Sequence, residues 1–330
     1  MSKLLIDETS ITGLADAIRT KGGTTALLKP GDMPSTIANM SGGGGSFTID
    51  GESATEDLNL FTEWGEDVKL HSTPYDFWQG CAVNYNHFIH ILGGGNTSTT
   101  RKYFYKYTGS GWTKLTNIPY TFIQGRAVVY RGEIHILGGG TTSTQRKYHY
   151  KWNGSAWTSV GTLPIEFSNG CAVVYNDEIH IFVSTSHYKW NGSTWTSVST
   201  LTFPFISPSA VVYKGEIHIL GGETHYKWNG STWTKASTLP YDFSAGCAEV
   251  INDELYILGG EYGSNFRYYW EGTQWGRWND IPSNVVESYG CVYNSASTVW
   301  MGAIHILGSY ESGYTTQHWG LDRVCYKKVI

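Results

Sequence analysis

Short stretches of alternating apolar and polar residues run through most of the chain, separated by Gly, Asn and Asp. One unit of this pattern predicts four strands, which we call A to D, at residues 171–175, 178–182, 187–190 and 195–201. Asn176-Asp177 joins A to B, and Asn191-Gly192 joins C to D. An Asn-Gly pair between alternating apolar residues favours a tight type I′ turn. The pattern therefore predicts antiparallel hairpins and an all-β chain.

The unit is repeated about every 40 residues, a period typical of propeller blades. A Gly-Cys-Ala step, or a relative of it, precedes strand A at residues 80, 125, 170, 208, 246 and 290. Ile-His-Ile-Leu-Gly-Gly or a variant follows as strand B, as at 134–139 and 217–222. Six such hairpins predict a six-bladed β-propeller over residues 46–330.

The end of strand B carries a second motif. A Gly pair is followed by an aromatic residue and a Trp, as in Tyr150 with Trp157 and Tyr226 with Trp233. With these motifs the chain resembles the kelch repeat family from about residue 58 to residue 330. The resemblance implies a propeller but no single function, because kelch propellers include adaptors, sugar binders and a few enzymes.

Closure of the predicted ring has two solutions. Residues 58–70, which include Trp64, could pair with the last strand C at 316–321. Alternatively, residues 324–329 could supply strand D of the last blade. The sequence leaves both open.

Composition and charge exclude several classes of function. The net charge is −5 and only 15% of residues are charged, so the Lys and Arg clusters that bind nucleic acid are missing. No apolar run is long enough for a transmembrane helix, and the segment before Asp7 lacks the apolar core of a signal peptide. Five Cys in 330 residues do not make a disulfide scaffold. We expect no nucleic-acid partner and no membrane insertion.

Residues 1–45 do not follow the repeat. Ile11, Leu14 and Ile18 have helical spacing, and Pro34 suits the first turn of a second short helix that includes Ile37. A Gly-rich linker follows. Two short helices bury too little apolar surface to fold alone, so the segment is predicted to be a helical anchor or oligomerisation interface.

The N-terminal segment also carries a resemblance of its own. Leu14-Ala15-Asp16-Ala17-Ile18-Arg19, with Gly31-Asp32-Met33-Pro34, is similar to N-terminal segments of tail-fibre proteins in phages and prophages of Gram-positive bacteria. The resemblance implies a virion protein, made in the host cytoplasm, that acts outside the host cell. It also implies attachment to phage tail or baseplate proteins through residues 1–45, and suggests a homotrimer.

The repeated His and Cys positions favour packing over chemistry. Zinc holds nitrogen at about 2 Å, and a disulfide needs Cα atoms within about 7 Å. Equivalent strands of facing sheets lie about 10 Å apart. We therefore expect no metal, no cofactor and no nucleophilic cysteine at these positions: His90, His135, His180, His218, Tyr256 and His305, and Cys81, Cys171, Cys247 and Cys291.

Other repeated polar positions are predicted to be turn residues. Asn153, Asn191 and Asn229 read formally as glycosylation acceptors, but each falls in a C–D turn. Three carboxylates share the D–A connection, where a glycosidase would need two of them about 5–10 Å apart. Because they belong to blades that are not neighbours, we expect turn roles for Asp76, Glu166 and Asp242.

Two charges interrupt the small residues of strand A. Arg126 replaces Cys in the second unit, and Glu249 replaces Val in the fifth. A buried unpaired charge costs several kcal/mol, so both are predicted to line a wet central channel. A ligand role near the mouth is the alternative.

The B–C loops differ between units. They are long in units 1, 2, 5 and 6 and almost absent in units 3 and 4, an asymmetry that folding does not require. Amides, hydroxyls and Arg beside aromatic rings suit a saccharide. The predicted ligand-binding residues are Trp78, Asn96, Thr97, Arg101, Tyr120, Gln145, Arg146, Tyr262, Asn265, Tyr310 and Tyr314. Trp300 and Met301, in an insertion between strands A and B of unit 6, are predicted interface residues.

These observations lead to one functional hypothesis and two alternatives. We expect a phage tail receptor-binding protein that binds a bacterial surface glycan and is not an enzyme. A kelch-type protein–protein adaptor is one alternative. A kelch-group carbohydrate-active enzyme is the other.

Overall fold

The computed structural model describes residues 47–49, 52–54, 61–64, 68–201, 205, 207–251, 253–260, 266–278, 296–300, 303–307, 318–321 and 324–327. The chain divides into one unit of Asp67–Leu321 and another of Met1–Glu66 with Asp322–Ile330. The predicted N-terminal helices, with Ile11, Leu14, Ile18 and Ile37, lie outside the described residues. Among the residues described, no helix is long and apolar enough to cross a membrane.

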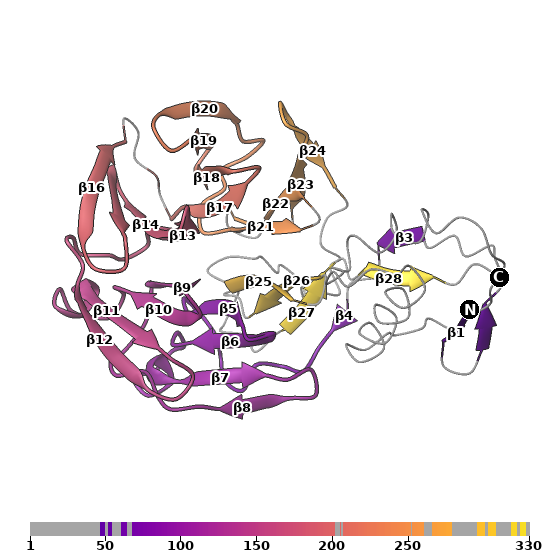
Figure 1. Ribbon diagram of the computed structural model, residues 1–330, viewed down its shortest axis with the longest axis horizontal. Coiled ribbons are helices and arrows are strands. Elements are labelled where there is room, and N and C mark those ends of the chain that lie inside the picture. The colour runs from indigo at the N-terminus through magenta and orange to yellow at the C-terminus, as the bar shows by residue number, and fades with distance from the viewer. Residues whose placement is uncertain are drawn as a thin grey trace. The chain divides into compact units, whose positions relative to one another are not determined.

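Five four-stranded antiparallel sheets are each formed by consecutive strands, which we number blades 1 to 5 (Figure 1). Blade 1 contains β5 (Cys81–Tyr85), β6 (Phe88–Leu92), β7 (Phe104–Tyr107) and β8 (Trp112–Lys114). Blade 2 contains β9 (Arg126–Tyr130), β10 (Glu133–Leu137), β11 (Tyr148–Trp152) and β12 (Trp157–Thr162). Blade 3 contains β13 (Cys171–Tyr175), β14 (Glu178–Val183), β15 (Ser186–Trp190) and β16 (Trp195–Thr200).

The last two of these sheets follow the same plan. Blade 4 contains β17 (Ser209–Tyr213), β18 (Glu216–Gly221), β19 (Thr224–Trp228) and β20 (Trp233–Thr238). Blade 5 contains β21 (Cys247–Ile251), β22 (Glu254–Leu258), β23 (Arg267–Trp270) and β24 (Trp275–Arg277). Short 3-10 helices, η2 (Thr100–Lys102) and η3 (Gln145–Lys147), precede strand C in blades 1 and 2.

A further four-stranded sheet is composite. Its strands are β25 (Ala296–Trp300), β26 (Ala303–Leu307), β27 (His318–Leu321) and β4 (Val68–Lys69). β4 pairs with β27, with Trp319 opposite Lys69 and Gly320 opposite Val68. The prediction of six equal blades is therefore corrected: five are contiguous, and the last repeat completes its sheet with a strand from before blade 1. Of the two closure schemes, the structure shows the first.

The innermost strands form a closed ring. β5, β9, β13, β17 and β21 lie side by side in this order, and β25 lies beside both β21 and β5 (Figure 1). β28 (Val324–Lys327) belongs to the other unit, where it pairs with β3 (Phe61–Trp64). β1 (Phe47–Ile49) pairs with β2 (Glu52–Ala54) in the same unit.

The C–D turns confirm the interpretation of the Asn-Gly-Ser motifs. In blade 2 the Asn153 side-chain oxygen accepts hydrogen bonds from the backbone N–H groups of Ser155 and Ala156, both at 3.0 Å. Asn191 and Asn229 make the same contacts in blades 3 and 4. An Asn side chain that bonds the backbone two residues on stabilises a turn.

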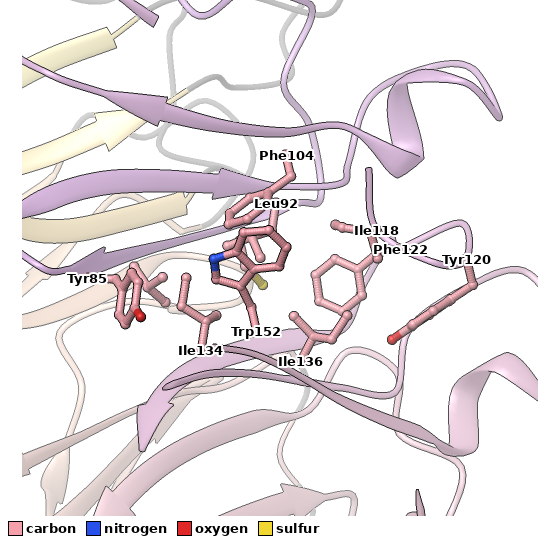
Figure 2. Close-up of a cluster of buried hydrophobic side chains, with 11 residues drawn as sticks. Tyr85, Leu92, Phe104, Ile118, Tyr120, Phe122, Ile134, Ile136 and Trp152 are labelled. Atoms are coloured by element: carbon pink, nitrogen blue, oxygen red, sulfur yellow. The ribbon is translucent and has the colours of Figure 1, made fainter. Parts of the chain in front are cut away.

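The core lies between neighbouring blades. Figure 2 shows Leu92 and Phe104 of blade 1 against Ile134, Ile136 and Trp152 of blade 2. The rings of Phe104 and Trp152 meet edge to face with centroids 5.3 Å apart, a favourable aromatic geometry. Aromatic residues that recur with the repeat therefore join blade 1 to blade 2.

Candidate functional site

The D–A connections and the B–C loops lie together on one face of the ring, which we call the loop face. In blade 1 the Gly95 N–H donates to the Trp78 carbonyl at 2.8 Å. In blade 2 the Gly140 N–H donates to the Ile123 carbonyl at 2.9 Å. Each B–C loop is thus fixed to the D–A connection of its own blade.

Several predicted ligand residues shape these loops. Arg101 Nε donates to the Gly95 carbonyl at 3.2 Å, and the Thr97 and Thr100 hydroxyls lie 3.0 Å apart. Gln145 Oε1 accepts from the Thr141 N–H at 2.9 Å and from the Thr121 hydroxyl at 3.0 Å. Arg101, Thr97 and Gln145 therefore have structural hydrogen bonds within the loop face.

Tyr120 is placed differently from its prediction. Its ring is only 4% exposed, and its hydroxyl donates to the Gly138 carbonyl at 2.6 Å. Tyr75 makes the equivalent bond to Gly93, also at 2.6 Å. Tyr120 therefore clamps the end of strand B rather than facing a ligand.

Three other predicted residues remain partly exposed on the loop face. Asn96 Nδ2 donates to an Asp76 carboxylate oxygen at 3.2 Å. Arg146 forms a loose ion pair with Glu166 at 3.7 Å, and Trp78 is half-buried. The three D–A carboxylates each contact a different partner. Asp76 accepts from Asn96, Glu166 pairs with Arg146, and Asp242 accepts from the Ser244 hydroxyl.

Tyr262, Asn265, Tyr310, Tyr314 and Met301 lie outside the described residues. Trp300 is the last residue of β25.

A central cavity of about 490 Å³ lies inside the ring of innermost strands. Arg126 and Glu249 both line it, together with the three buried cysteines Cys81, Cys171 and Cys247. Cys81 Sγ donates to the Gly125 carbonyl at 3.2 Å. Burial raises the pKa of Cys171 to about 12, so this thiol is protonated at neutral pH and is a poor nucleophile.

Comparison with known proteins identifies the architecture. No protein-family model matches the chain, and no curated protein matches its sequence. Among solved structures, that of YjhT, a kelch-type propeller, aligns with a TM-score of 0.64 over 77% of this chain and 95% of that one, at 15% identity. The fold is a kelch-type β-propeller. An identity this low extends to the fold alone.

The propeller contains buried histidine pairs that the sequence analysis missed. His135 Nδ1 lies 2.8 Å from His149 Nε2 in blade 2, and blades 3 and 4 repeat the pair as His180–His187 and His218–His225. Burial lowers the pKa of His135 to about 4 and that of His149 to about 3. In the part of the chain that is described, no group of three or more His, Cys, Asp or Glu side chains is arranged to hold a metal.

The second histidine of each pair joins two blades. His149 packs edge to face on Trp190 of blade 3, with centroids 5.3 Å apart, and also contacts Trp195. His187 and His225 make the same contacts with the Trp pairs of blades 4 and 5. His149, His187 and His225 therefore pack between blades, and each is hydrogen-bonded to the strand-B histidine of its own blade.

The residue two positions before each strand A was also missed. It has a positive φ in all five contiguous blades, although none of these residues is Gly: Gln79, Gln124, Asn169, Ser207 and Ala245. Left-handed backbone costs a residue with a Cβ about 1 kcal/mol, and Asn tolerates it best after Gly. We call these five residues the rim.

Proposed function

We propose that this chain is the receptor-binding protein of a phage tail, and that its propeller binds a bacterial surface glycan without chemistry. The observation that carries the proposal is the asymmetric, polar loop face. Blades 1 and 2 extend exposed hydroxyl and amide groups there, including Asn96, Thr97, Thr141 and Thr142, beside the half-buried Trp78. Aromatic faces and clustered hydrogen-bonding groups suit a saccharide.

The short loops of blades 3 and 4 support the same proposal. β14 and β15 are joined by Ser184-Thr185 alone, and β18 and β19 by Gly222-Glu223, which leaves no room for a longer B–C loop. The ring therefore has a low side beside the raised loops of blades 1 and 2. A repeat protein needs no such asymmetry to fold, so it favours a binding role.

Residues 1–45 supply the phage part of the proposal. Their resemblance to tail-fibre segments supports attachment to tail or baseplate proteins, assembly as a homotrimer and a location on the virion.

The test is binding of the fluorescently labelled full chain to Gram-positive cells and to an array of bacterial glycans. We expect saturable binding that Asn96→Ala weakens. Thr194→Ala is the matched control, because Thr194 is also exposed but lies in a C–D turn of blade 3. Binding to neither cells nor glycans contradicts the proposal, as does turnover of a bound sugar.

A further inference from the structure

Backbone hydrogen bonds join the rim residues of blades 1 to 3 in one row, and those of blades 4 and 5 in another. The Gln124 N–H donates to the Gln79 carbonyl at 2.9 Å, and the Asn169 N–H donates to the Gln124 carbonyl at 2.9 Å. The Ala245 N–H donates to the Ser207 carbonyl at 3.0 Å. These bonds hold consecutive rim residues side by side across the boundaries between blades.

The rim surrounds one end of the central cavity. Gly80 and Gly246, which line this cavity, directly follow the rim residues Gln79 and Ala245. The B–C loop of blade 2 is bonded to the residue before Gln124, since the Gly140 N–H donates to the Ile123 carbonyl. The rim therefore lies on the loop face, at the mouth of the cavity.

The choice of residues at the rim is not explained by folding. The left-handed backbone belongs to the repeat, because all five rim residues share it. Glycine adopts this conformation freely, and Ala245 shows that the position needs no polar side chain. Blades 1 and 2 nevertheless have Gln, which is not a residue that favours positive φ. Non-Gly residues with positive φ also occur in the A–B turns, but at the rim this conformation recurs in every contiguous blade beside the cavity. That recurrence is a reason to look for a function of the rim side chains.

The side-chain amides of the rim are available to a ligand. Those of Gln79 and Asn169 have no hydrogen-bond partner among the described residues. Gln124 Oε1 accepts from the Ser168 hydroxyl at 3.2 Å, which directs its other amide atom, the NH₂ donor, away from Ser168. Arg126, which lines the cavity, lies two residues after Gln124. Three residues with amide side chains, from adjacent blades, thus lie in one row beside the residues that line the cavity.

We propose that Gln79, Gln124 and Asn169 form a saccharide subsite at the mouth of the central cavity and determine which sugar the propeller accepts. The inference rests on the proposed function and adds the contact residues of that site. A carboxamide both donates and accepts, so a row of amides is complementary to the hydroxyl and acetamido groups of a sugar chain. Ser207 and Ala245 carry no amide, so recognition falls on blades 1 to 3.

The experiment measures the affinity of the full chain for chitotriose and maltotriose by calorimetric titration. These probes separate acetamido from hydroxyl recognition. Gln79→Ala and Gln124→Ala should weaken binding about three- to tenfold each, the effect of one lost hydrogen bond. Gln124→Glu keeps the acceptor for Ser168 but removes the NH₂ donor, so it should weaken binding as well. Ala245→Gly is the matched control: it relaxes the same backbone strain and should raise the melting temperature without changing affinity.

The same variants are compared in the cell-binding assay, which separates the two proposals. If the wild-type chain binds a saccharide or cells and the Gln variants bind equally well, the rim proposal is wrong and the proposed function stands. If the wild-type chain binds neither, both are wrong. A variant that loses binding only because it unfolds is recognised by its melting curve. In that case the affinity of Gln124→Glu decides whether the rim amide contacts the saccharide.

Discussion

In blades 1, 2 and 5, a tyrosine hydroxyl donates a hydrogen bond to the carbonyl of the glycine that follows strand B. Tyr75, Tyr120 and Tyr241 donate to the carbonyls of Gly93, Gly138 and Gly259. Blade 3 has Ile165 and Val183 at these two positions, and blade 4 has Gly221 with Phe203. In blade 4 the Gly221 carbonyl instead accepts from the Thr224 hydroxyl at 2.9 Å. The tyrosine of the clamp is therefore a structural residue and not an exposed ligand contact.

Tyr120→Phe tests this clamp. The substitution leaves the buried Gly138 carbonyl without its donor, which should lower the free energy of unfolding by about 1–2 kcal/mol. Urea denaturation measures the loss. Tyr150→Phe is the control, since Tyr150 is half-buried and its hydroxyl makes no hydrogen bond to any residue that the structure describes. Both variants should bind saccharide as the wild-type chain does. Loss of saccharide binding in Tyr120→Phe alone would show that Tyr120 contacts the ligand after all.

Sequence alone predicts the strands well, because the repeat averages local signals over many copies. The predicted strand A of unit 3 coincides with β13, and the predicted strand B is one residue shorter than β14. The repeat does not reveal the histidine pairs. Phe104 and Arg267 replace the second histidine in blades 1 and 5, so this position has no constant residue type. The contact between the two histidines of a pair also depends on the register between strands B and C.

The histidine pairs make blade packing sensitive to acid. Their folded-state pKa values, about 4 and about 3 in blade 2, lie below the ordinary 6.5. The unfolded chain therefore takes up protons before the folded one does. The contribution of these histidines to the free energy of unfolding is fully present above pH 6.5, and it is lost as the pH falls from 6.5 toward 4. One pKa unit corresponds to about 1.4 kcal/mol. A single histidine whose pKa is lowered from 6.5 to about 4 therefore accounts for up to about 3 kcal/mol of the free energy of unfolding lost in acid.

Thermal unfolding between pH 7 and pH 4 measures this dependence. We expect the melting temperature to fall with pH, and to fall less in His149→Phe. That variant copies blade 1, where Phe104 has the same register position and packs on Trp152 and Trp157. A wild-type melting temperature that is constant over this range would rule out acid-sensitive packing.

At the scale of the whole molecule, the candidate site was only partly predictable. The loop face follows from the lengths of the B–C loops, which are visible in the sequence. The rim does not, because Gln, Gln, Asn, Ser and Ala share no chemistry, and only their backbone conformation unites them. Ring closure was also undecided, because pairing between β4 and β27 joins the two ends of the propeller sequence. Such a pairing leaves no local pattern.

Ring closure gives the last prediction, through two truncations that differ by a few residues. Removal of residues 1–66 leaves β4 in place, so the propeller unit should keep its cooperative unfolding. Removal of residues 1–70 deletes β4 and leaves β27 as an open edge, because β4 is its partner on that side. An unpaired edge strand invites aggregation and loses a row of hydrogen bonds. We expect the shorter chain to melt several degrees lower and to be cleaved faster by protease. Equal behaviour of the two chains would show that β4 does not close the ring.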